Sequence, residues 1–355
     1  MGENTFDFGI YSLGERLPDA KGVMQHPAKR IEDIIQTAKL ADEAGLDIFG
    51  IGEHHRVDFV TSSYAMILAA IARETKNIKL TSTLSVISTI DPVRLYEDFA
   101  TLDLLSKGRT EIIVGRGAFI ESFSLFGANL SEYDELFEEK LKLFLMLQKN
   151  EEVNWKGKFR TKLQNAKIAP RPMNKEIPLW IGVGGTPESA IRAGRLGANM
   201  ALGLLSGPPE NAKHLADLYW SSAKEAGHDL SKLRVSVSGH AYLAETGEQA
   251  VEDFYPLYIK YFSHFMKERG QRFYVSKESI HHQRAANQIL AVGSAEEIVE
   301  KILYQYELFG HSRFMGQLDL GEQSLSKIEK AIDLLANKVA PIVRKEINKK
   351  RVSSI

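Results

Sequence analysis

The sequence predicts a single (β/α)8 TIM barrel, because short apolar runs and amphipathic stretches alternate from one end of the chain to the other. The chain has 355 residues and an apolar content of 44%, which suffices to bury the core of one large α/β domain. Its length exceeds the ~250 residues of a typical barrel. We therefore expect one domain over residues 1–355, with insertions between strands four and five and between strands seven and eight.

Eight runs of apolar and β-branched residues end in glycine or polar turn signals, as barrel strands do. They cover residues 6–11, 46–52, 78–88, 109–118, 178–185, 198–206, 233–245 and 313–320. The first helix is expected over residues 31–45, where Ile34, Ala38 and Ala41 share one face and Gly45 ends the pattern. This alternation is what a parallel barrel requires.

The later helices are marked by their boundaries and by their apolar period. Amphipathic stretches cover residues 62–76, 91–108, 131–150, 186–197, 212–227 and 325–343. Four helices carry capping signals, namely Asp91 before Pro92, Thr186 before Pro187, and the capping-box pairs Thr246 with Gln249 and Ser294 with Glu297.

Two segments interrupt the alternation of strands and helices. Residues 150–177 contain polar and proline turn signals, and we expect a surface excursion there. Residues 264–293 mix basic, aromatic and histidine residues without a clear period. That composition fits a mobile loop beside an active site, and it also fits a plain surface loop.

The composition excludes several classes of protein. With 45 Lys plus Arg against 46 Asp plus Glu, the formal net charge is −1, so neither nucleic acid nor an anionic membrane is an expected partner. The chain has no cysteine, which excludes disulfides and thiol catalysis. No apolar run approaches the roughly 18 residues of a membrane span. We therefore expect a cytoplasmic protein.

The sites of such barrels lie at the C-terminal ends of the strands. Polar residues and glycines gather at these positions: Glu53, His54 and His55 after strand two, Ser82, Thr83 and Ser85 on strand three, Arg116 after strand four, and Gly184, Gly185 and Thr186 after strand five. The hydroxyls of strand three can face inward and hydrogen-bond a planar polar ligand. They can equally be ordinary strand residues on the outer face.

The segment GGTPES, residues 184–189, has the composition of an anion site. Its glycines allow close backbone approach, and the helix that follows offers free N–H donors and a favourable dipole. Arg116 would supply a bidentate countercharge. The alternative is a tight turn capped by Thr186, with the dipole satisfied by Glu188.

His54 and His55 are adjacent, so in an extended chain at most one of them faces the barrel axis. A purely structural hydrogen-bonding role is the alternative for either ring. Adjacent residues chelate one metal ion poorly, and no third ligand has suitable spacing. No metal site is therefore expected.

Taken together, these motifs resemble the bacterial luciferase-like flavin monooxygenase family. The strongest likeness is continuous over residues 50–117, with EHH after strand two, DPVRLYEDFATLDLLSKGR around the third helix, and GRG after strand four. The GGTPES turn and the segment GEQSLSKIEKAIDLLANKVAPIVR, residues 321–344, continue it.

This resemblance implies FMN as the cofactor. Its phosphate would be held by Arg116, Gly184, Gly185, Thr186 and Ser189, its isoalloxazine would lie against Thr83 and Leu84, and His54 would be the catalytic histidine, with Glu53 and His55 orienting it. Reduced FMN, supplied by a separate flavin reductase, would react with O2 to form a C4a-peroxide that oxidises a small organic molecule such as an aldehyde. The resemblance also implies a homodimer, and a mobile active-site loop at residues 264–293.

The sequence departs from the light-emitting members of that family at Gly115, where they have a reactive cysteine. This departure argues against light emission and implies a different space beside the flavin. Two other functions stay open, a deazaflavin (F420)-dependent hydride-transfer oxidoreductase and a non-catalytic flavin-binding subunit. The EHH motif favours the flavin branch, and retention of His54 and Arg116 favours an enzyme.

Overall fold

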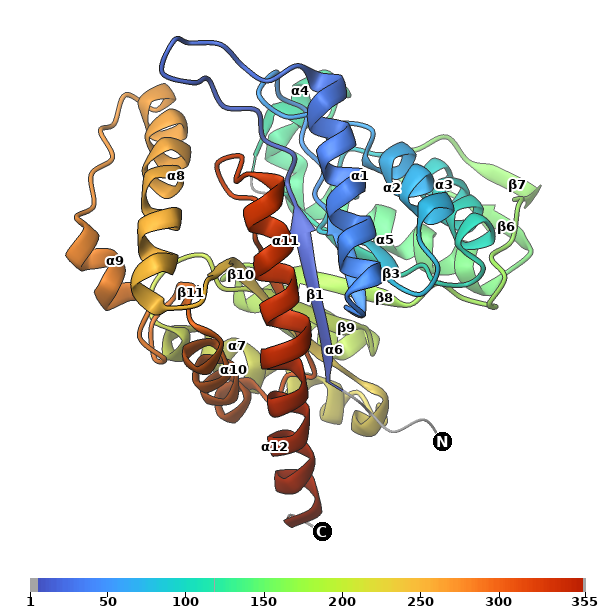
Figure 1. Cartoon of the computed structure of the whole chain (residues 1–355). Coiled ribbons are helices and arrows are strands. Elements are labelled where there is room, and N and C mark those ends of the chain that lie inside the picture. Colours follow the sequence, from blue (N-terminus) through green and yellow to red (C-terminus); the bar gives the residue numbers. More distant parts are fainter. Residues whose placement is uncertain (1–5, 118, 354–355) are drawn as a thin grey trace.

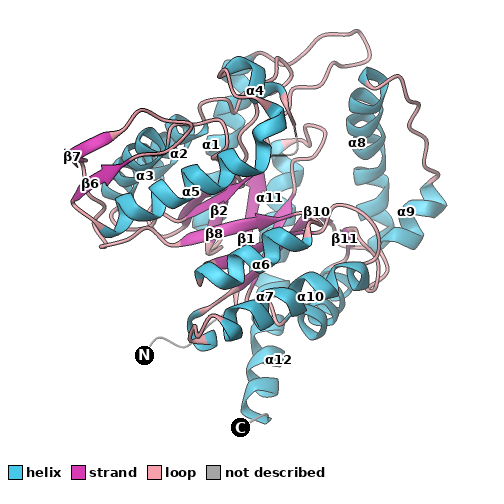
Figure 2. Ribbon diagram, turned by 180° about the vertical axis from the view of Figure 1, so that it is seen from behind, coloured by secondary structure: helices cyan, strands magenta, loops and turns pink. Residues whose placement is uncertain are grey.

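A ring of parallel strands surrounded by helices forms the body of the molecule in the computed structural model, which describes residues 6–117 and 119–353. Nine strands are hydrogen-bonded in the order β3, β2, β1, β12, β10, β9, β8, β5, β4. Figures 1 and 2 show helices lying around these strands. A parallel bridge between Leu80 and Thr110 brings β3 beside the start of β5, so the ring is nearly closed. The predicted (β/α)8 fold is confirmed.

The barrel strands coincide with the eight predicted runs. They are β1 (Asp7–Ser12), β2 (Ile48–Ile51), β3 (Lys79–Ser82) with β4 (Ser85–Val86), β5 (Ile112–Gly115), β8 (Leu179–Val183), β9 (Asn199–Gly203), β10 (Val235–Leu243) and β12 (Arg313–Gln317). The third run is divided into β3 and β4 by a cis peptide bond between Thr83 and Leu84. Ala118, the last residue of the fourth predicted run, lies outside the described residues.

The helices pack their apolar faces against the outside of this ring. They are α1 (Pro27–Glu43), α2 (Tyr64–Glu74), α3 (Pro92–Ser106), α5 (Tyr133–Lys149), α6 (Pro187–Leu196), α7 (Lys213–Glu225), α10 (Ala295–Phe309), α11 (Leu325–Leu334) and α12 (Ala340–Ser353). Asp91 caps α3 by accepting from Val93 and Arg94, as predicted. No helix of the described chain combines the length and apolarity that crossing a membrane requires.

The two irregular segments contain further elements. Within residues 150–177, β6 (Glu152–Trp155) and β7 (Leu163–Lys167) form an antiparallel hairpin beside the barrel. Between β10 and β12 the chain adds α8 (Gly247–Glu268), α9 (Lys277–Gln283) and β11 (Ala291–Gly293), which pairs with β10. Figure 1 shows α8 standing apart from the other helices, with α9 at its side. A short helix, α4 (Glu121–Leu125), follows β5.

Buried charge fills the N-terminal end of the barrel. The guanidinium of Arg313 is fully buried, with Nη2 2.9 Å from Asp7 Oδ2 and Nη1 2.7 Å from Glu111 Oε2. It also lies 4.2 Å from the centroid of the Trp180 ring. Because Asp7 and Arg313 begin their strands, this cluster blocks the N-terminal end. The opposite, C-terminal end of the strands is the one available to a ligand.

Candidate active site at the C-terminal end of the barrel

Glu53, buried just past β2, connects the loop after that strand to the neighbouring strand. Its Oε2 accepts a hydrogen bond from the backbone N–H of Val86, at 2.7 Å, and its Oε1 lies 2.8 Å from His55 Nε2. The ring of His55 contacts the Phe126 ring edge-on, with 4.8 Å between centroids. Both polar side chains are therefore occupied within the protein. Neither side chain forms a hydrogen bond with His54 among these contacts, so the orienting role that the resemblance implies for them stays a prediction.

His54 has a different environment. Its ring stacks on Phe59, with 4.3 Å between centroids, and meets Phe119 edge-on at 5.1 Å. Burial lowers the pKa of His54 to about 3, with a smaller contribution from His55. The imidazole is therefore neutral near pH 7. Its Nδ1 has no hydrogen-bond partner among the described residues, so His54 is able to accept a proton or a hydrogen bond.

Thr83 and Leu84 lie on either side of the cis peptide bond, and both face glycines of other strands. A Cβ on Gly50 of β2 would lie 2.4 Å from Thr83 Cγ2. A Cβ on Gly115 of β5 would lie 2.4 Å from Leu84 Cδ2, and one on Gly182 of β8 would lie 2.6 Å from it. The glycines therefore make room for these two side chains. In particular, Leu84 fills the space that a side chain at position 115 would need.

Arg116 and Ser189 lie together, as the sequence predicts for an anion site. Arg116 Nη2 is 3.2 Å from Ser189 Oγ, in the first turn of α6. Arg116 Nη1 pairs with Asp134 Oδ1 at 2.7 Å, and its guanidinium lies 5.0 Å from the Tyr133 ring centroid. The side chain of Asp134 is 70% exposed. This surface carboxylate is a partner that an incoming anion can replace.

The turn before α6 leaves open space for a ligand. A Cβ added to Gly184 or Gly185 would meet no atom within 4 Å. Thr186 occupies the N-cap position, but its side chain makes no capping hydrogen bond, so the alternative of a turn capped by the Thr186 hydroxyl is not what the structure has. A free hydroxyl, exposed glycines and a helix N-terminus beside an arginine fit a phosphate group.

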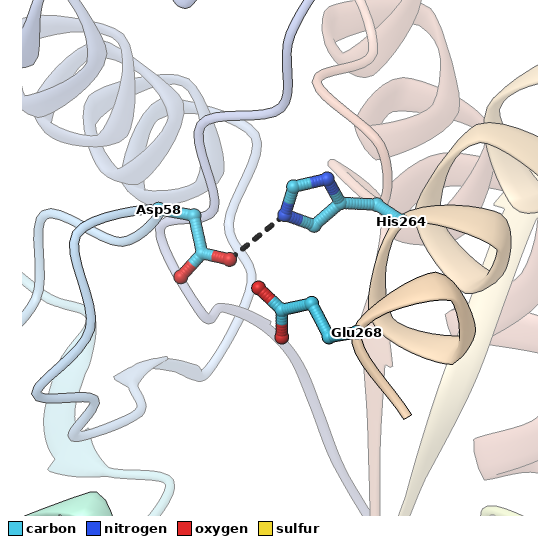
Figure 3. Close-up of side chains that lie close together, drawn as sticks. All are labelled: Asp58, His264 and Glu268. Atoms are coloured by element: carbon cyan, nitrogen blue, oxygen red, sulfur yellow. Dashed lines mark hydrogen bonds and ion pairs between the residues drawn. The ribbon is translucent and has the colours of Figure 1, made fainter. Parts of the chain in front are cut away.

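A second group of charged residues, which sequence reasoning missed, joins the loop after β2 to α8. Figure 3 shows Asp58 facing His264 and Glu268, and Asp58 Oδ2 lies 2.9 Å from His264 Nε2. The potential ligand atoms of the three side chains lie within 4.8 Å of one another. Arg56 Nη2 contacts Asp58 Oδ2 at 2.8 Å and Glu268 Oε2 at 2.6 Å. The arginine thus supplies the positive charge that this group needs.

Arg56 extends this group toward His54. Its guanidinium lies 5.3 Å from the centroid of Phe119 and 5.4 Å from that of Phe265, and Nη1 pairs with Glu121 of α4 at 2.7 Å. Phe119 is one of the two rings that contact His54. The cluster therefore holds α4, α8 and the His54 loop in one arrangement. No sequence signal marks it, because 206 positions separate Asp58 from His264.

A third polar group, also missed, lies where β1 and β12 end. Arg30 Nη2 is 2.6 Å from Asp319 Oδ2, and Ser12 Oγ donates to the same oxygen. Glu15 is fully buried nearby, and burial together with the charge of Asp319 raises its pKa to about 8. Glu15 Oε2 lies 3.8 Å from Arg30 Nη2, but neither it nor Asp319 Oδ1 has a hydrogen-bond partner among the described residues. Two carboxyl groups thus share one guanidinium at the barrel mouth.

A parallel barrel that brings an arginine, a helix N-terminus and a neutral histidine to the C-terminal ends of its strands has its polar groups where such barrels have their active sites. The family model of luciferase-like monooxygenases matches residues 8–312. The chain belongs to the luciferase-like monooxygenase family.

Relatives across that family agree in fold and differ in cofactor. The oxygenase component of the flavin-dependent trigonelline monooxygenase of Acinetobacter baylyi is 23% identical over 353 residues, covering 94% of each chain. The oxygenating constituent of 3,6-diketocamphane monooxygenase from Pseudomonas putida, in complex with FMN, superposes with a TM-score of 0.75 at 19% identity, covering 95% of this chain and 98% of that one. The F420-dependent tetrahydromethanopterin reductase of Methanopyrus kandleri gives a TM-score of 0.72 at 19% identity, covering 96% and 99%.

Proposed function

We propose that this protein is the oxygenase of a two-component flavin-dependent monooxygenase, acting in the cytoplasm on a small organic substrate. It would use reduced FMN from a separate flavin reductase together with O2. The observation that carries the proposal is the meeting of Arg116 and Ser189 beside the open turn of Gly184 and Gly185. The relatives named as a flavin-dependent oxygenase component and as an FMN complex support the same choice of cofactor.

The residues of this chain would divide the work as follows. Arg116, Ser189 and the free backbone donors at the start of α6 would bind the FMN phosphate. Leu84 and Thr83 would form an uncharged surface for the ring system. When bound, reduced FMN supplies the reaction with O2 and the transfer of one oxygen atom to the substrate.

His54 would serve this reaction as a neutral acid–base group. Because burial lowers its pKa to about 3, it carries no positive charge at neutral pH, and its unpaired Nδ1 can accept a hydrogen bond from the substrate or cofactor. Glu53 and His55 would hold the loop that carries it. Residues 264–293, adjoining the Arg56 cluster, would cover the site and exclude water.

A deazaflavin-dependent hydride transfer is the second candidate, because F420-dependent relatives share the fold and F420 also carries phosphate. A non-catalytic flavin-binding subunit is the third. The first proposal also includes a homodimer. Apolar side chains exposed on two helices support it, namely Met66 on α2 and Leu104 and Leu105 on α3.

The test begins with protein loaded anaerobically with reduced FMN and mixed with O2 in a stopped-flow instrument. We expect His54→Leu to change the rate of flavin reoxidation or the yield of hydrogen peroxide by roughly tenfold or more, in line with loss of an acid–base group. The surface variant His214→Leu, on α7 and outside residues 264–293, should behave like the wild type. Identical traces for His54→Leu and wild type would favour a flavin-binding subunit over an enzyme.

A further inference from the structure

A chain of hydrogen bonds fixes the protonation of a second histidine at the barrel mouth. Gly321 donates its backbone N–H to Glu15 Oε1 at 2.9 Å, which marks that oxygen as an acceptor. Gln317 Nε2 lies 3.4 Å from the same oxygen, so the NH2 end of its amide faces Glu15. Gln317 Oε1 then faces His240 Nδ1, at 3.0 Å. Since a carbonyl oxygen only accepts, the proton of His240 resides on Nδ1.

This arrangement leaves the other ring nitrogen as an acceptor. Burial lowers the pKa of His240 to about 4, so the ring is neutral and Nε2 carries a lone pair. Nε2 has no hydrogen-bond partner among the residues that the structure describes, and it is not one of the fully buried polar atoms that lack a partner. This acceptor therefore keeps contact with solvent. A ligand that donates a hydrogen bond can bind to it there.

His240 lies at the same end of the barrel as the proposed cofactor site. It pairs in register with Gln317, the last residue of β12. On the neighbouring strand, β9 ends at Gly203, where an added Cβ would meet no atom closer than 3.9 Å. Open space therefore adjoins the strand beside His240.

Aromatic rings from α8 surround the imidazole. The ring centroids of Tyr258, Tyr261 and Phe262 lie 6.4, 6.3 and 5.7 Å from that of His240. Phe262 in turn stacks on Phe273, at 5.1 Å. Such a wall favours a flat aromatic molecule, which can meet these rings edge to face.

The lone pair of Nε2 disfavours an anionic partner. A carboxylate or sulfonate brought to this nitrogen would place an acceptor against an acceptor. Glu15, protonated below its pKa of about 8, and the paired Asp319 and Arg30 add no net charge nearby. The compatible group is a neutral donor.

We propose that His240 Nε2 accepts a hydrogen bond from a hydroxyl or N–H group of an aromatic substrate, a phenol being the simplest member of that class. His240 is then a residue that determines substrate specificity at the C-terminal mouth of the barrel. The inference rests on the proposed function, because it places the substrate at the mouth where the flavin would bind.

The binding test compares phenol with anisole, which has the same ring but no donor. Dissociation constants are measured by calorimetry on purified protein, with and without FMN. We expect phenol to bind about tenfold more tightly than anisole, the difference that one hydrogen bond of ~1.4 kcal/mol makes. His240→Phe should reduce this ratio to about one, and the exposed control His214→Phe, on α7, should keep it. Equal binding of the two probes by wild type, no binding of phenol, or an unchanged ratio in His240→Phe would overturn the inference.

A spectroscopic measurement keeps the inference testable if His240→Phe fails to fold. In protein with 15N-labelled histidine, the NMR signals of His240 should show a directly bonded proton on Nδ1 and none on Nε2. Gln317→Leu removes the acceptor at Nδ1 and should shift the tautomer toward a proton on Nε2. A protonated Nε2 in the wild type would contradict the assignment. Neither measurement depends on oxygen chemistry, so a protein that fails to bind reduced FMN would refute the proposed function separately.

Discussion

Arg116 and Ser189, 73 positions apart in the chain, meet at the start of α6 with 3.2 Å between Nη2 and Oγ. The strand order explains the meeting, because β5 and β8 are neighbours in the barrel and both end there. An arginine after one strand and a helix N-terminus after the next thus point at the same volume. This relationship supports a phosphate at that position.

Removing the arginine should weaken binding only for ligands that carry phosphate. Arg116→Met is expected to raise the dissociation constant of reduced FMN by roughly tenfold to a hundredfold, because a charge-assisted pair contributes about 1.5–3 kcal/mol. Riboflavin has the same ring without the phosphate and should bind the variant and the wild type alike. Equal losses for FMN and riboflavin would mean that Arg116 does not contact the phosphate.

The carboxylate that now pairs with Arg116 should have the opposite effect. Asp134→Asn frees the guanidinium and removes a negative charge next to the proposed phosphate. We expect FMN to bind a few-fold more tightly, since exposed charges contribute up to ~1 kcal/mol. Fluorescence titration of the flavin measures the change, and raising the salt concentration should diminish it. A weaker affinity in Asp134→Asn would place the phosphate elsewhere.

A substitution at Gly115 tests how closely Leu84 packs against β5 below the proposed flavin. Gly115→Ala places a methyl group 2.4 Å from Leu84 Cδ2, and such overpacking should lower the free energy of unfolding by about 1–3 kcal/mol. Leu84→Ala in the same chain should recover part of that loss, because it vacates the space. Urea unfolding of the two single variants and the double variant measures the coupling. Strictly additive changes would show that the two side chains do not compete.

Arg56 should hold α8 against the His54 loop. Arg56→Met leaves the buried carboxylate of Asp58 without its guanidinium partner and frees Glu268, so we expect a loss of about 3 kcal/mol in unfolding free energy. Hydrogen exchange should increase at the C-terminal end of α8. Arg94→Met, which removes the surface pairs of an exposed arginine with Glu97 and Asp98, is the matched control. If hydrogen exchange in α8 is unchanged in Arg56→Met, the cluster does not hold α8 in place and does not help to cover the active site.

The raised pKa of Glu15 predicts a pH dependence of stability. The native state keeps this carboxyl protonated up to a pKa of about 8, whereas the unfolded chain loses the proton near 4.5. The native state therefore binds more protons between these values, and stability should fall as the pH rises from about 4.5 to about 8. Glu15→Gln should flatten that part of the profile in urea unfolding. A wild-type stability that rises over the same interval without flattening in the variant would contradict the assignment.

The regular parts of the fold follow from local pattern, and that is why they could be predicted. Strand runs, apolar periods and the Asp91 cap depend on residues a few positions apart. The β6–β7 hairpin was missed because its strands are short and mostly polar, and only Val153 among their residues is buried. Of the two predicted capping boxes, the one at Ser294 is complete. At Thr246 it is half formed, because the Gln249 side chain bonds Asp253 instead.

Some residues of the candidate site could likewise be predicted from local sequence, and others could not. Arg116, Ser189 and His54 were predictable from their place after strands together with the family resemblance. The contact of Asp58 with His264, and the link from Glu15 through Gln317 to His240, depend on residues 77 to 302 positions apart. No period or short motif records such contacts, which only the closed barrel brings together.

Anaerobic titration of the purified protein with reduced FMN, beside reduced F420 and reduced riboflavin, tests the central claim most directly. The account predicts a dissociation constant for reduced FMN in the micromolar range or below, weaker binding of the other two, and loss of the FMN preference in Arg116→Met. Preferential binding of F420, or no binding of reduced FMN at micromolar concentration, would contradict it.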